Sequence, residues 1–226
     1  MTERQRQLLK NIVNQYIEKA QPVGSEFLCE KIKPGVSSAT IRNEMTELIG
    51  QGYLFQPHLS AGRIPSLKGF EYYVDHLLEQ RDLSEYQKKS LAKIKKQEKQ
   101  KRELMKSLAK KISSLTGQLS ILAFANNDFY YTGFTDLFNQ PEFQEPSAVY
   151  SISQIVDHLD KTMVQIFNLP KKQTHVLVGK KNPFGNYCSA ILVHCPKYGL
   201  IGIIGPTRMQ YDKNIALIDY TCKLLN

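Results

Sequence analysis

The sequence lacks the features of a membrane-spanning or exported chain. No apolar run reaches the roughly 20 residues that a helix needs to cross a bilayer. Residues 1–6 lead into an amphipathic helical pattern instead of the apolar core of a signal peptide. The 226 residues are 42% hydrophobic, which suffices for one large or two small domains with buried cores. We therefore expect a cytoplasmic protein that does not contact a membrane.

Motifs of catalysis and metal binding are also missing. Neither GxSxG nor HExxH occurs, the five histidines lie far apart, and residues 179–185 lack the order of a phosphate-binding loop. The four cysteines show no CxxC spacing, and we interpret them as scattered thiols without chemistry. They are Cys29, Cys188, Cys195 and Cys222. The sequence thus predicts no enzyme, no cofactor and no metal.

Positive charge is unevenly distributed along the chain, whose net charge is +9. Residues 1–79 hold nine Lys/Arg and nine Asp/Glu, whereas residues 80–112 hold twelve and four, a surplus of +8. Any affinity of the neutral segment for nucleic acid must therefore come from local groups. Arg42, Arg63, Lys68 and helix N-termini are the candidates.

A helical pattern begins at residue 38, and its polar outer face is not required for packing against a hydrophobic core. Its apolar stripe is Ile41, Met45, Leu48 and Ile49. Ser37 or Ser38 can cap its first turn, and Gly52 ends it. Short polar groups, one forked donor and one amide remain outside, and such side chains read base edges and phosphates in a major groove. These outer residues are Ser38, Ala39, Thr40, Arg42 and Asn43.

The flanking segments predict a winged helix-turn-helix. A second helical pattern over 25–32, with Ser25 as its cap, precedes the turn 33–36, which contains a glycine. A short β-like run over 53–57 and residues 64–65 predict a hairpin with a Gly and an Arg at its tip, suited to contact the DNA backbone or minor groove. We interpret His58 as a structural or phosphate-contacting residue. The candidate DNA-binding residues are Ser37, Ser38, Thr40, Arg42, Asn43, His58, Ser60, Gly62, Arg63 and Lys68.

Three domains are expected from these patterns. Helices over 2–20, with Thr2 and Gln5 at capping-box distance, and over 67–81 complete a winged-helix domain of residues 1–81. Residues 82–115 predict a long basic linker helix with a polar gap between Ile94 and Leu104. Its lysines serve either solubility or additional phosphate contacts.

Residues 116–226 predict an α/β domain, so the fold class is α+β. Strands are expected at 118–125, 175–178, 186–194 and 199–204, and helices at 152–167 and 207–225. The turn at 205–209 either holds an anion or is braced by Arg208 through backbone carbonyls or through a carboxylate such as Asp212 or Asp219.

Several of these segments resemble the family of the heat-inducible transcription repressor HrcA. The matching segments are 22–25, 35–43, 56–58, 60–65, 68–69, 72–75, 139–143, 205–209 and Tyr211. The resemblance implies a GAF-like fold for residues 116–226. It also implies a repressor that binds an inverted repeat in double-stranded DNA upstream of chaperone genes. Such repressors depend on a GroE-type chaperonin to stay active.

The chain departs from that family in length. Family members carry an inserted dimerisation domain before the motif at 139–143, whereas here only residues 125–138 separate that motif from the preceding strand. We therefore expect a homodimer formed through the sheet edge or the terminal helix of the α/β domain, because the basic helix has a broken apolar seam and would repel its copy.

The alternative function is an interaction module that binds nucleic acid without sequence specificity or binds a protein.

Overall fold

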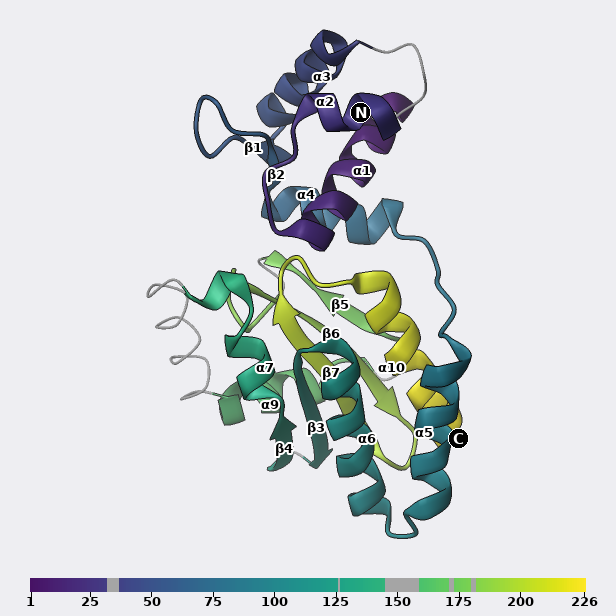
Figure 1. The fold of residues 1–226 in the computed structure, drawn as a ribbon. Helices are drawn as coiled ribbons and strands as arrows, with labels where there is room; N and C mark the ends of the chain where they lie inside the picture. Colours follow the sequence, from purple (N-terminus) through teal and green to yellow (C-terminus); the bar gives the residue numbers. More distant parts are fainter. Residues whose placement is uncertain (32–36, 126, 145–158, 171–172, 180–181) are drawn as a thin grey trace. The chain divides into compact units, whose positions relative to one another are not determined.

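A computed structural model describes residues 1–31, 37–125, 127–144, 159–170, 173–179 and 182–226. The chain divides into two compact units, an amino-terminal unit Met1–Leu78 and a carboxy-terminal unit Glu79–Asn226 (Figure 1). The division lies close to the predicted domain boundary at residue 81, but the predicted middle domain is not separate from the carboxy-terminal unit. Among the described residues, no helix combines the length and the apolar character needed to cross a membrane.

Helices and one small hairpin build the amino-terminal unit. In chain order they are α1 (Glu3–Lys19), α2 (Ser25–Lys31), α3 (Ser38–Gly50), β1 (Leu54–Phe55), β2 (Ile64–Pro65), α4 (Leu67–Tyr72) and the π-helical turn η1 (Tyr73–Leu77). The predicted capping box starts α1: the Thr2 hydroxyl accepts from the Gln5 N–H, and the Gln5 side chain accepts from the Thr2 N–H. The helix predicted over 67–81 is shorter and ends in η1.

The core of this unit lies between α1, α3 and the segment from α4 to η1. Its buried side chains include Leu8, Leu9, Ile12, Val13, Leu28, Ile41, Met45, Leu48, Leu54, Phe70 and Tyr73. The Tyr73 hydroxyl donates to Asn14 Oδ1 at 2.7 Å, which joins η1 to α1. Of the apolar stripe predicted for α3, Ile41, Met45 and Leu48 are at most 1% exposed, whereas Ile49 is half-buried.

An antiparallel sheet forms the centre of the carboxy-terminal unit, with the strand order β4-β3-β7-β6-β5. The strands are β3 (Leu119–Ala125), β4 (Asp128–Thr132), β5 (His175–Leu177), β6 (Cys188–Cys195) and β7 (Gly199–Pro206). One face carries α5 (Glu85–Gln97), α6 (Lys101–Thr116) and α10 (Tyr211–Leu225). The other packs against α7 (Phe134–Phe138), the 3-10 turn η2 (Pro141–Gln144) and α9 (Leu159–Phe167) (Figure 1).

The basic segment does not form the predicted single linker helix. It is a pair of helices, α5 and α6, separated by an extended residue at Glu98, and the break falls in the polar gap between Ile94 and Leu104. The apolar residues of α6 recur often enough to cover a whole helix face, which packs on the sheet. Leu104, Met105, Leu108, Ala109 and Ile112 are all at most 6% exposed. Thus α6 is a core helix of the carboxy-terminal unit.

Other elements of this unit differ from the prediction in detail. The expected strands correspond to β3, β5, β6 and β7, whereas β4 and α7 were not predicted. The last helix begins at Tyr211 instead of residue 207, because β7 continues through Pro206 and a turn follows in which the Met209 N–H donates to the Pro206 carbonyl. For the helix predicted over 152–167, α9 accounts for its final part, and its start lies outside the described residues.

Arg208 braces the domain, which was one of the two alternatives for this turn. Its guanidinium forms an ion pair with Glu142 and donates from Nη2 to Gln140 Oε1 at 3.2 Å. The predicted partners Asp212 and Asp219 were wrong. Asp212 pairs with Arg81, and Asp219 accepts from Thr174.

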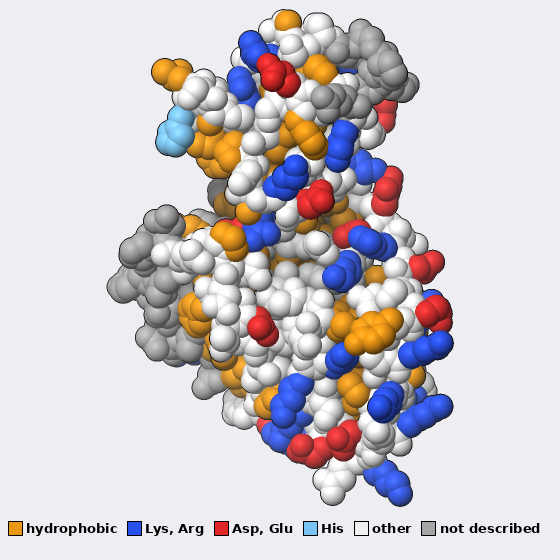
Figure 2. Space-filling view, in the orientation of Figure 1, with side chains coloured by type: hydrophobic (Ala, Val, Ile, Leu, Met, Phe, Trp, Pro, Cys, Tyr) orange, Lys and Arg blue, Asp and Glu red, His pale blue; other side chains and the backbone are white. Residues whose placement is uncertain are grey.

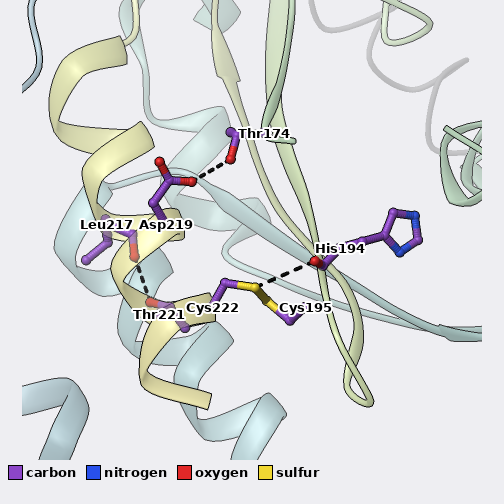
Figure 3. Close-up of a disulfide and its surroundings, with 7 residues drawn as sticks. All are labelled: Thr174, His194, Cys195, Leu217, Asp219, Thr221 and Cys222. Atoms are coloured by element: carbon purple, nitrogen blue, oxygen red, sulfur yellow. Dashed lines mark hydrogen bonds between the residues drawn. A yellow bond between two sulfur atoms is a disulfide. The ribbon is translucent and has the colours of Figure 1, made fainter. Parts of the chain in front are cut away.

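The structure corrects the interpretation of the four cysteines as scattered thiols. Cys195 at the end of β6 and Cys222 in the last turns of α10 form a disulfide, with their Cα atoms 5.1 Å apart (Figure 3). Their separation of 27 residues spans a strand and most of a helix, so only the folded sheet brings them together. Burial raises the pKa of the Cys188 thiol to about 12, which leaves that thiol unreactive near neutral pH.

The position of α6 predicts how its residues tolerate truncation. Leu108→Ala should cost about 2–5 kcal/mol of stability, because it leaves a cavity under a fully buried position. The matched change Lys110→Ala, at an exposed position of the same helix, should stay within about 0.5 kcal/mol. Urea unfolding of the full chain measures both, and equally small effects would mean that α6 is a solvated helix.

Candidate nucleic-acid interface

The first turn of α3 is capped by its own sequence. The Ser37 hydroxyl accepts from the Thr40 N–H at 3.2 Å and lies 3.0 Å from the Thr40 hydroxyl. Ser37 and Ala39 are exposed, and Ser38 and Thr40 are half-buried. At the other end, Gly52 takes the left-handed conformation, with φ +80°, just after the helix. These two signals set the start and the end that the sequence predicts.

The inner face of α3 is fixed to α1 by polar contacts as well as by its apolar stripe. Buried Glu44 forms an ion pair with Arg4, and Glu47 accepts from Gln5 Nε2 at 2.6 Å. Because these contacts set the rotation of the helix about its axis, its outer face is determined too.

Arg42 and Asn43 lie on that outer face. Both are exposed, and no ion pair or side-chain hydrogen bond engages either of them within the part of the chain that the structure describes. The Arg42 carbonyl accepts from the Thr46 hydroxyl, a backbone contact that does not involve the guanidinium. The Arg42 guanidinium and the Asn43 amide are therefore both exposed to solvent, near a capped helix N-terminus.

The hairpin after α3 presents its tip to solvent (Figure 1). Leu54 pairs with Pro65 and Phe55 with Ile64, and the loop between them is ordered by Gln56. Gln56 Nε2 donates to the carbonyls of Leu59 at 2.7 Å and Ala61 at 3.0 Å. The exposed residues of the tip are His58, Leu59 and Ser60, and Leu59 is 101% exposed.

The base of the hairpin is held against residues 22–23. Val23 and Arg63 exchange two backbone hydrogen bonds of 2.9 Å, and a Cβ at Gly62 would lie 2.5 Å from the Val23 carbonyl atoms. Glycine at residue 62 thus permits close packing. The expectation that Gly62 and Arg63 form the tip was wrong. Arg63 is half-buried, and its Nε is buried without a hydrogen-bond partner among the described residues.

Lys68 on α4 has local partners. Its ammonium donates to the Gln51 carbonyl at 2.8 Å and lies 4.5 Å from the centre of the Tyr53 ring. These contacts brace the segment between α3 and the hairpin. Lys68 is nevertheless exposed, so its charge reaches solvent.

The candidate residues therefore fall into three places. Residues 37–43 form the exposed end of α3, His58 and Ser60 sit at the hairpin tip, and Gly62, Arg63 and Lys68 support the hairpin from its base. The predicted turn at 33–36 lies outside the described residues. Leu59 was not among the candidate residues predicted from the sequence. An apolar residue in a turn with no core to pack against is a signal that could have indicated it.

The amino-terminal unit does not have a generally basic surface. On the face drawn in Figure 2, cationic and anionic side chains alternate over the amino-terminal unit. This agrees with the balanced count over residues 1–79. Any binding of nucleic acid by this unit therefore has to come from individually placed side chains and not from general positive charge.

Comparisons with known proteins converge on one family. The family model described as HrcA protein C terminal domain matches residues 42–215. A heat-inducible transcription repressor HrcA of Carboxydothermus hydrogenoformans is 27% identical over an alignment that covers 99% of this chain and 97% of the relative. The repressor of the same name from Desulforamulus reducens is 55% identical over 85 residues, 38% of this chain and 24% of the relative.

A solved structure described only as a hypothetical protein shares the fold. Its TM-score is 0.79, with 17% identity, and the match covers 100% of this chain and 97% of the other. The mixed helix and sheet architecture is therefore one that a folded protein is known to adopt.

This chain is shorter than those relatives. The alignment to the Carboxydothermus protein extends over 331 positions, whereas the chain has 226 residues, so about a third of the alignment has no counterpart here. The sequence likewise predicts a chain shorter than the members of that family. The relatives are transcription repressors and not enzymes. With the family model matching most of its length, the chain belongs to the family of heat-inducible transcription repressors HrcA.

Proposed function

We propose that the chain is a sequence-specific repressor of heat-shock chaperone genes, acting in the cytoplasm as a homodimer on an inverted-repeat operator. One observation carries this proposal. The inner face of α3 is occupied by its contacts with α1, while Arg42 and Asn43 remain exposed on the outer face beside a capped N-terminus. Such a face serves no core and has the chemistry that reads base pairs.

In this proposal the amino-terminal unit is a winged helix-turn-helix. Helices α2 and α3 form the helix-turn-helix, α3 enters the major groove, and the β1–β2 hairpin is the wing. The hydrogen bonds of Gln56 support this role, because they hold the wing tip in one conformation before DNA arrives.

The residues then divide by the part of DNA that they contact. Arg42 donates with two N–H groups to a guanine edge, and Asn43 pairs with adenine. Residues 37–40, together with the free N–H groups of the first turn, bind a phosphate. His58 and Ser60 contact backbone oxygens from the wing tip.

Three further residues act from the base of the wing. Gly62 lets the hairpin pack against residue 23, and Arg63 and Lys68 add positive charge near the backbone. Because Arg63 is half-buried and Lys68 is engaged with Gln51, we assign them smaller contributions than Arg42.

The carboxy-terminal unit is the GAF-like domain of this proposal, and it holds the dimer contact. The apolar face of α10 is already buried, with Leu217, Ile218 and Leu225 at most 4% exposed, so that helix has little left for a partner. The described sheet ends in β4 on one side and β5 on the other. The longer of these, β4, is half-buried and offers its backbone edge to a second copy.

Two further roles remain predictions. Exposed lysines of α5, such as Lys93 and Lys96, would add phosphate contacts that do not depend on sequence. A GroE-type chaperonin would support the active dimer.

Arg42→Ala should weaken binding to the preferred DNA sequence by about 1–3 kcal/mol and relax the preference at one base position of each half-site. Arg42→Lys keeps the charge and loses the fork, so it should relax the same position while retaining most of the salt dependence. Per-position base profiles, obtained from binding to pools in which each position is varied, measure both.

Arg6→Ala is the matched control. This arginine is also exposed, pairs with Glu3 on α1, and should leave the base profile unchanged. If Arg42→Ala gives the wild-type profile as well, Arg42 does not read DNA.

Assembly gives a second prediction. A piece of residues 79–226 should sediment as a dimer at about micromolar concentration, and a piece of residues 1–78 as a monomer, since each keeps its own buried core. The larger piece has to include α6, because that helix covers one face of the sheet. Dimeric 1–78 with monomeric 79–226 would contradict the assignment of the dimer contact.

A further inference from the structure

The Cys195–Cys222 disulfide ties the end of β6 to the last turns of α10 (Figure 3). Cys195 is 2% exposed and Cys222 is 8% exposed, so bulk solvent barely reaches either sulfur. The bond closes a segment that contains the whole of β7 and most of α10.

A cavity of about 650 Å³ lies beside this bond, and Cys195 is part of its wall. The wall also includes the start of α6, Phe124 at the end of β3, the turn from Pro196 to Gly199, and His194 with Phe167 of α9. Strand alternation places Cys195 on the same face of the sheet as Val193 and its partner Ile201, which is the face that carries α6 and α10. The Arg102 guanidinium carbon lies 4.3 Å from the centre of the Phe124 ring, so Phe124 lies on the same side.

Positive charge surrounds the cavity. Its described lining includes Lys101, Arg102 and Lys197 and no carboxylate. Arg102 is neutralised by a two-pronged contact with Asp128, which also holds the pKa of that carboxyl below its ordinary value. Lys101 and Lys197 have no carboxylate partner within the described part of the chain. Two cations without a carboxylate partner therefore stand at a cavity whose wall includes one cysteine of a buried disulfide.

The backbone fixes the shape of this wall. Gly199 has φ +94°, and a Cβ there would lie 2.2 Å from the Ala123 carbonyl oxygen, so only glycine lets the turn pack against β3. The Lys101 ammonium lies 4.9 Å from the centre of the Tyr198 ring, which joins α6 to the same turn.

We propose that this cavity admits small thiols of negative charge to the disulfide, which they reduce by thiol–disulfide exchange. The thiolate attacks Cys195 Sγ, the bond between the two cysteines breaks, and Cys222 leaves as a thiolate that takes up a proton. A second thiolate attacks the outer sulfur of the mixed disulfide and releases Cys195, which is protonated in turn. Two thiols become one disulfide, and the protein gains two electrons and two protons.

The fold also accommodates the reduced state. Cys222 Sγ lies 3.6 Å from the His194 carbonyl oxygen (Figure 3). In the disulfide this sulfur has no proton, so the contact becomes a hydrogen bond only when Cys222 is a thiol. Reduction therefore removes the covalent link between α10 and β6 while giving the new thiol a hydrogen-bond partner.

Three reagents with the same carbon skeleton test the proposal on the full chain. They are 2-mercaptoethanesulfonate, which is anionic, 2-mercaptoethanol, which is neutral, and cysteamine, which is cationic. Loss of the disulfide is followed by alkylation and mass spectrometry. In the variant Lys101→Gln/Lys197→Gln, the rate with the sulfonate should fall about tenfold, the rate with mercaptoethanol should barely change, and the rate with cysteamine should rise.

The control is Lys89→Gln/Lys93→Gln, which removes the same charge from exposed positions of α5 outside the cavity wall and should retain wild-type rates. Equal changes with all three reagents, or none, would overturn the role of the cavity. Four alkylatable thiols in chain purified without reductant and then denatured would overturn the disulfide.

Single-cysteine variants test which sulfur is attacked. The disulfide of mercaptoethanesulfonate should modify Cys195 in Cys222→Ser faster than Cys222 in Cys195→Ser, because only Cys195 lines the cavity. The reverse order would overturn the attack at Cys195.

Discussion

The contact between α3 and α1 is the constraint on which the proposed DNA-binding surface depends. The apolar stripe of α3 would permit small rotations about the helix axis, but the buried Glu44 carboxylate must keep Arg4, and Glu47 must keep Gln5. Breaking either contact would leave a buried polar group without its partner. The direction in which Arg42 and Asn43 point is therefore set by the opposite face of the same helix.

The β1–β2 hairpin, which is the proposed wing, is also held in place by local contacts. The Val23–Arg63 pairing and the close approach at Gly62 fix its base, and the hydrogen bonds of Gln56 fix its loop. A nearly neutral unit cannot depend on general attraction to phosphates, so its candidate contacts have to be held in position beforehand. The carboxy-terminal unit contributes the assembly surface of the proposal. In that proposal, the β4 edge is the candidate contact.

The sequence predicts best those elements whose signals are local. The Thr2/Gln5 capping box, the Ser37 cap with the stripe of α3, and Gly52 all act within a few residues, and the structure agrees with each. Membership of the family also followed from short motifs.

Features that depend on distant residues were missed or misplaced. In the sequence, the polar gap after Ile94 is compatible with one solvated helix and with a break between two helices. Only the packing of α6 on the sheet decides between these two structures. Arg208 has two nearby aspartates in sequence, yet its partner is Glu142, because the fold brings residues 139–143 to the turn after β7. The pairing of Cys195 with Cys222 likewise exists only once α10 lies on β6.

Selection of bound sequences from a random pool of double-stranded DNA, with the full chain at physiological salt, tests whether the chain reads DNA sequence. One enriched motif with two-fold symmetry, bound at least about a thousandfold more tightly than random DNA, is the expected result. A pool without an enriched motif, with binding that disappears as salt rises, would contradict it and favour a module that binds nucleic acid without regard to sequence.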